Sequence, residues 1–141
     1  RNERFRWLAT LEKRILLTKS YPLPALHTLA GEGFSEAENL EVFGPCSRLH
    51  GHDYRIEATV SGPVDHASGL VINRDVLDKA VKTHLLDPFV GTNLSDHFQH
   101  TTGEALAVEF FGILKGCLPA NVALVRIRLH ETAKNSFIAG D

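Results

Sequence analysis

The sequence predicts an α+β fold, in which an antiparallel β-sheet carries two helices on one face, within one domain spanning residues 1–141. Three observations support this prediction. Apolar and polar residues alternate at 5–18 and 52–62, as in half-buried strands, and the segment 121–132 is rich in β-forming residues. Two runs between them carry apolar residues at helical spacing. Finally, 141 residues, 43% of them hydrophobic and 23% charged, suit one compact core.

Strands are predicted at residues 5–18, with a bulge near Arg14, at 52–62, at 121–132 and at 136–139. The alternation is clearest in the second of these segments, HDYRIEATVSG. Between the first two strands, prolines and glycines predict a long irregular stretch that reaches about Pro45 and includes a short helical turn at 35–43. The residues behind this interpretation are Pro22, Pro24, Gly31 and Gly33.

The first predicted helix follows Asn73, a suitable N-cap, and runs through RDVLDKAVKTHLL until Pro88 stops it. The second begins near Thr102, whose hydroxyl can cap it, and ends near Gly116. A sheet this small leaves edges to be paired, so we expect edge pairing between subunits in a homo-oligomer.

Composition excludes several classes of function. With 15 Lys and Arg against 17 Asp and Glu, the net charge is −2, and no basic block indicates a nucleic acid partner. No apolar run approaches the roughly 20 residues that span a bilayer, and no signal region is visible. We therefore expect a cytoplasmic protein that binds neither nucleic acid nor membranes. The two cysteines make no disulfide framework.

The sharpest local pattern is Cys46-Ser-Arg-Leu-His50-Gly-His52, at the start of the clearest strand. Residues i and i+2 of a strand point to the same face, so the two imidazoles can converge on one metal ion. Three histidines with an open fourth position are typical of a catalytic zinc site. His27, in the apolar segment PALHTLA, is the best candidate for the third ligand.

Each of these residues also has an ordinary interpretation. A lone histidine such as His27 is more often packed or exposed than bound to a metal, and Cys46 alone is more often a small buried hydrophobe. Their coincidence in one short region favours the metal site, because a thiol beside a cation becomes a usable base or nucleophile.

The chain resembles the 6-pyruvoyl-tetrahydropterin and 6-carboxy-tetrahydropterin synthase family. The resemblance is carried, in order along nearly the whole chain, by PALH, ENLEVFGPCSRLHGHDY, GLVIN, TTGEALA and LHETAKN. It implies that His27, His50 and His52 bind Zn²⁺, that Cys46 is the catalytic proton acceptor, and that Glu131 anchors a pterin ring. The spacing of Cys46 and His50 looks more like the bacterial 6-carboxy branch, whose product feeds queuosine-type biosynthesis.

The family resemblance also implies a tunnelling fold, in which subunits join their sheets into a barrel, as a trimer or a hexamer with active sites between subunits. The implied activity is that of a carbon-oxygen lyase acting on 7,8-dihydroneopterin triphosphate. One carboxylate, that of Glu131, can accept both adjacent N–H groups of a pterin. Thr102 and Glu104 can bind polar ring edges, although helix capping explains Thr102 equally well.

The sequence departs from the family at its usual Asp-His relay, where Val90 and Gly91 stand instead. The nearby Asp96-His97 pair is our candidate replacement, and His100 is another. The alternative is a pterin- or zinc-binding homologue without turnover, and a weaker third hypothesis is a zinc hydrolase that uses metal-bound hydroxide. Retention of Cys46 favours the lyase, since a pure binder needs no thiol beside the metal.

Overall fold

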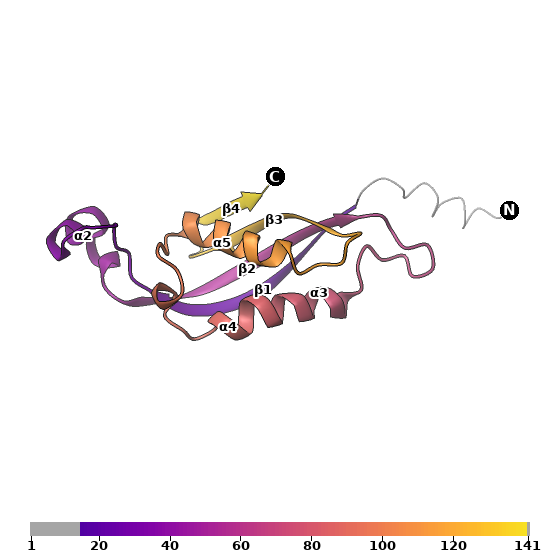
Figure 1. The fold of residues 1–141 in the computed structure, drawn as a ribbon, viewed down its shortest axis with the longest axis horizontal. Coiled ribbons are helices and arrows are strands. Elements are labelled where there is room, and N and C mark those ends of the chain that lie inside the picture. Colours follow the sequence, from indigo (N-terminus) through magenta and orange to yellow (C-terminus); the bar gives the residue numbers. More distant parts are fainter. Residues whose placement is uncertain (1–14, 141) are drawn as a thin grey trace.

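The computed structural model describes residues 15–140, and the four strands form one antiparallel sheet in the order β1-β2-β3-β4 (Figure 1). The elements are β1 (Ile15–His27), α2 (Glu36–Phe43), β2 (His50–Gly62), α3 (Arg74–Val81), α4 (Asp87–Phe89), α5 (Gly103–Lys115), β3 (Ala123–His130) and β4 (Ser136–Gly140). The helices α3 and α5 cover one face of the sheet, which confirms the predicted α+β class.

The first strand differs from its prediction. β1 continues to His27, so the irregular stretch expected from Pro22 onward is wrong as far as that residue. The part of the prediction that covers residues 5–14, including the bulge near Arg14, lies outside the described residues. Inside β1, alternate residues from Tyr21 to His27 are buried.

Pro22 and Pro24 fit in β1 because the backbone nitrogen and carbonyl at these positions point away from β2. At that parity, the carbonyl of Pro24 accepts from the Gly91 N–H at 2.7 Å, and the Leu26 N–H donates to the Thr92 carbonyl at 2.9 Å. A proline at such a position removes no hydrogen bond from the ladder between β1 and β2.

Pro88 does not stop the first long helix as predicted. A π-helical turn (Lys82–Leu86) follows α3, and the Asp87 N–H donates to the Lys82 carbonyl five residues back. Pro88 then lies in the first turn of α4, where its missing N–H costs little. The helical path therefore continues to Phe89, whose ring packs against those of Phe98 and Phe110.

The predicted helix starts are confirmed. Asn73 Oδ1 accepts a hydrogen bond from the Asp75 N–H at 2.8 Å, and Thr102 Oγ1 accepts one from the Ala105 N–H at 3.2 Å. The short helical turn expected at 35–43 is α2, which Ser35 caps. The C-terminal strands also form, as β3 and β4.

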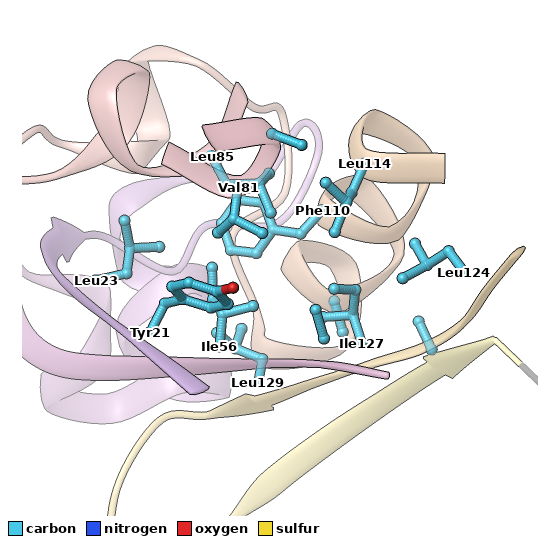
Figure 2. Close-up of a cluster of buried hydrophobic side chains, with 14 of the residues drawn as sticks. Tyr21, Leu23, Ile56, Val81, Leu85, Phe110, Leu114, Leu124, Ile127 and Leu129 are labelled. Atoms are coloured by element: carbon cyan, nitrogen blue, oxygen red, sulfur yellow. The ribbon is translucent and has the colours of Figure 1, made fainter. Parts of the chain in front are cut away.

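The core lies between the sheet and the helices α3 and α5 (Figure 2). Side chains from all the layers meet there, among them Tyr21, Ile56, Leu129, Val81, Leu85, Phe110 and Leu114. By contrast, α2 buries no residue and sits on an arm that projects from the end of the sheet (Figure 1). No helix within residues 15–140 is long and apolar enough to cross a membrane.

Candidate metal centre

Three histidines meet where β1 ends and β2 begins. Antiparallel pairing places His27 directly opposite His50, and His52 lies two residues further along β2 on the same face. The ring centroids are 4.5 Å apart for His27 and His50, 5.0 Å for His27 and His52, and 4.9 Å for His50 and His52. One nitrogen of each ring lies within 4.8 Å of the other two.

Backbone carbonyls select the tautomers of two of these rings. Nδ1–H of His27 donates to the Thr101 carbonyl at 2.8 Å, and Nδ1–H of His50 donates to the Arg48 carbonyl at 2.7 Å. With Nδ1 protonated, the lone pair of a neutral imidazole is on Nε2, and metal-binding histidines are commonly oriented in this way. The cluster therefore presents nitrogen donors suited to a metal ion.

His27 is 1% exposed, the most buried of the three histidines. Burial lowers its pKa below that of a free imidazole, against the raising effect of its hydrogen bond to Thr101. The ring is consequently neutral at neutral pH, which is the state that binds metals.

A segment after α4 holds the backbone around His27. Ser95 Oγ accepts from the Thr28 N–H at 3.0 Å and also lies 3.2 Å from the Thr28 carbonyl oxygen. The hydroxyl of the buried Thr101 donates to that same carbonyl at 2.9 Å. The backbone carbonyl of Thr101 in turn accepts the hydrogen bond from Nδ1–H of His27. Sequence reasoning missed Ser95 and Thr101, since neither residue type is a metal ligand and their partner lies about 70 residues away.

Tyr54 completes the inner side of the cluster. Its hydroxyl lies 3.1 Å from Nδ1 and 3.2 Å from Nε2 of His27, and its ring packs edge-on against His27 and His52. Burial, reinforced by the negative charge of Glu131, raises the pKa of Tyr54, so the phenol stays protonated. A signal was available in the sequence, because residue 54 shares the parity of 50 and 52.

Glu131 follows the last residue of β3. Its charge favours the protonated forms of His27 and Tyr54, so the carboxylate lies within electrostatic reach of the cluster. Its Oε1 accepts a hydrogen bond from Asn135 Nδ2 at 3.1 Å. Beside it, a hollow of about 540 Å³ is lined by Asp53, Arg55, His130, Glu131, Thr132 and Ala133.

Cys46 lies in a 3₁₀ turn (Gly44–Ser47) on the arm that carries α2, and its side chain is exposed. Its carbonyl accepts from the Leu29 N–H at 2.9 Å, which ties this turn to the chain two residues beyond His27. The thiol is not part of the three-histidine group.

The structure does not bring Asp96 and His97 into the group of three histidines. Both are exposed, at the end of a 3₁₀ turn (Leu94–Asp96), and the ring of His97 packs against Phe89 with centroids 5.1 Å apart. Val90 is also exposed, and Gly91 pairs with the outer edge of β1.

Thr102 uses its hydroxyl to cap α5, so its capping interpretation is confirmed. Glu104 is exposed in the first turn of the same helix, where a carboxylate interacts favourably with the helix dipole.

The sequence model of 6-pyruvoyl tetrahydropterin synthase matches residues 16–140. The chain belongs to this family. The Drosophila melanogaster 6-pyruvoyl tetrahydrobiopterin synthase is 37% identical over an alignment of 126 residues, and the match covers 84% of this chain and 75% of that relative. The Homo sapiens synthase is 33% identical over 118 residues, covering 79% of this chain and 81% of its own.

Solved structures in the 6-pyruvoyl tetrahydropterin synthase family share the fold. The Caenorhabditis elegans enzyme superposes with a TM-score of 0.84 at 30% identity, covering 91% of this chain and 96% of its own. A shorter match, 40% identical over 75 residues, joins half of this chain to the 6-carboxy-5,6,7,8-tetrahydropterin synthase of Bacillus subtilis.

Proposed function

We propose that this protein is a zinc-dependent lyase of tetrahydropterin synthesis that acts on 7,8-dihydroneopterin triphosphate. The observation that carries the proposal is the group of three histidines, two of them with Nδ1 bonded to carbonyls, in a chain of the 6-pyruvoyl tetrahydropterin synthase family. Such a donor set leaves one coordination position for a substrate oxygen.

The residues fit a zinc ion. Tetrahedral coordination at about 2.0–2.1 Å from each nitrogen separates the nitrogens by roughly 3.3 Å. The three donors lie within 4.8 Å of one another, so small ring rotations bring them to that geometry. Histidine nitrogens suit zinc better than they suit magnesium or calcium, which prefer oxygen ligands.

Cys46 and Glu131 have separate roles in the proposed reaction. When bound, zinc supplies Lewis acidity that makes substrate hydroxyls and the neighbouring carbon more acidic. The Cys46 thiolate accepts the carbon-bound proton, and this requires the exposed arm to bring the thiol to the substrate. The Glu131 carboxylate accepts two N–H groups of the pterin and thereby orients the ring.

The relay is the part of the proposal that departs from the family. Val90 and Gly91 carry no group that can transfer a proton, so we assign this role to Asp96 and His97. We expect His97→Gln to lower turnover by about 100-fold. The control is His84→Gln, which replaces an exposed histidine beyond α3 and should leave turnover unchanged. Unchanged turnover in His97→Gln would exclude the assignment.

The proposed homo-oligomer, a trimer or hexamer, is supported by unpaired edges. Among the described residues, no strand covers the outer edge of β4 or the first half of β1. The arm with α2 also exposes apolar side chains, namely Phe34, Leu40, Val42 and Leu49. Burying such side chains between subunits stabilises an assembly.

The decisive experiment supplies dihydroneopterin triphosphate to the zinc-loaded protein and measures released triphosphate. We expect release by the wild-type protein and none by Cys46→Ala, with unchanged zinc content. Zinc and pterin binding without turnover would instead indicate a binding homologue. Activity that survives in Cys46→Ala would indicate hydrolysis by metal-bound hydroxide. Identifying the organic product then separates the 6-pyruvoyl branch from the 6-carboxy branch.

A further inference from the structure

The turn between β3 and β4 is organised around Asn135. Its carbonyl accepts from the Glu131 N–H at 3.2 Å. Its side-chain Oδ1 accepts from the Thr132 N–H at 3.2 Å and from the Thr132 hydroxyl. Its Nδ2 donates to Oε1 of Glu131 at 3.1 Å. One side chain thus joins the backbone of the turn to the Glu131 carboxylate, whose charge acts on His27 and Tyr54.

We propose that Asn135 is a positioning residue that orients the Glu131 carboxylate for pterin binding. The inference rests on the proposed function, in which Glu131 binds the ring. Asn135 itself touches no substrate in this account and acts only through Glu131.

The terminal torsion of a glutamate is broad, so an unrestrained carboxylate samples many orientations of its plane. A two-pronged contact to adjacent N–H groups requires one of these orientations. Because Oδ1 of Asn135 is held by Thr132, the direction of its Nδ2–H is set by the turn. Its bond to Oε1 then favours one carboxylate plane and leaves Oε2 and one lone pair of Oε1 available.

The competing explanation is that Asn135 only shapes the turn. Two variants separate the explanations. Asn135→Asp keeps an oxygen acceptor for Thr132 but loses the donor and adds a negative charge beside Glu131. Asn135→Ala loses donor and acceptor without adding charge. Weakened ring binding in both variants would therefore follow from their shared defect, the missing donor to Glu131.

The test measures the dissociation constant of neopterin, which lacks the triphosphate, for the zinc-loaded full chain. We expect Asn135→Asp and Asn135→Ala to weaken binding by about 5-fold, because a Glu131 carboxylate without this donor must be ordered when the ring binds. Thr132→Ala, which removes the hydroxyl that holds Asn135 but keeps the Thr132 N–H and the Glu131 contact, should weaken binding less than either Asn135 variant does. In turnover assays KM should rise more than kcat falls.

A double-variant cycle shows whether Asn135 acts through Glu131. We expect Glu131→Gln combined with Asn135→Ala to bind neopterin no more weakly than Glu131→Gln alone. Additive losses, or wild-type affinity in Asn135→Asp, would overturn the inference. Wild-type affinity in Glu131→Gln would instead overturn the proposed role of Glu131. Zinc content and melting temperature, measured for every variant, identify any variant that misfolds. If Asn135→Ala misfolds, the affinity of Asn135→Asp decides the test.

Discussion

His27 and His50 are paired residues of neighbouring strands, and their ring centroids lie 4.5 Å apart. Residues directly opposite in an antiparallel pair have Cβ atoms only about 4.5–5.5 Å apart, so the sheet register itself brings these rings together. The metal centre thus depends on the register of β1 against β2. A shift of one residue would turn His27 to the opposite face.

The network behind His27 should contribute to zinc affinity. Ser95→Ala removes the hydroxyl that contacts both the N–H and the carbonyl of Thr28, next to His27. We expect zinc affinity to fall by about 10-fold, the lower end of the effects seen when partners of metal ligands are removed. Competition with a chromophoric chelator measures the affinity.

The control for this prediction is Ser68→Ala. Ser68 also bonds locally, to Asp65, but lies in an exposed loop that contains no residue of the cluster. Its loss should leave zinc affinity unchanged. Equal affinities in the two variants would show that the Ser95 network does not support His27.

A second prediction concerns the link between β1 and α3. Oδ1 of Asp78 accepts hydrogen bonds from Lys19 Nζ at 2.6 Å and from the Tyr21 hydroxyl at 2.7 Å. These two bonds, the one from Lys19 first, lower the pKa of Asp78. A carboxyl whose pKa is lower in the folded state stabilises the fold above its unfolded pKa, about 3.9, and loses this effect as pH falls through the folded value. Asp78→Asn should therefore lower the melting temperature at pH 7.

As the pH falls through the lowered pKa of Asp78, the melting temperatures of Asp78→Asn and the wild type should converge, because the wild-type carboxyl becomes protonated. Asp87→Asn is the matched control. Its partner Lys82 forms a comparable pair at 2.9 Å, but both side chains are more than half exposed. It should change stability little. A difference between Asp78→Asn and the wild type that is independent of pH would contradict this account.

The third prediction tests the layer between sheet and helices. Phe110 is fully buried and packs against Phe89 and Phe98. Phe110→Ala should lower the free energy of unfolding by about 3–5 kcal/mol. Val108→Ala, at an exposed position of the same helix, should change it by about 0.5 kcal/mol or less. Urea denaturation of the two variants measures both values.

The sequence was informative wherever the signal was local. The pair His50 and His52 could be predicted, because parity within one strand determines where both side chains point. The N-caps Asn73 and Thr102 could be predicted for a similar reason, since each bonds to an N–H two or three residues away.

Long-range features could not be predicted in this way. The prolines of β1 indicated an irregular stretch, and only the sheet order shows that their missing N–H groups face the outer edge. Ser95 and Thr101 are invisible as site residues, because their partners belong to a strand end about 70 residues earlier. Asn135 belongs to the motif LHETAKN, but the bond from its side chain to Glu131 is visible only in the coordinates.

X-ray absorption of the zinc-loaded protein tests the metal centre most directly. We predict one zinc ion per chain with three imidazole nitrogens at about 2.0–2.1 Å. Any of the variants His27→Ala, His50→Ala and His52→Ala that still binds zinc should show two imidazole nitrogens instead of three. Zinc bound with the same number of imidazoles in the wild type and in His27→Ala, or no stoichiometric zinc at all, would contradict the account.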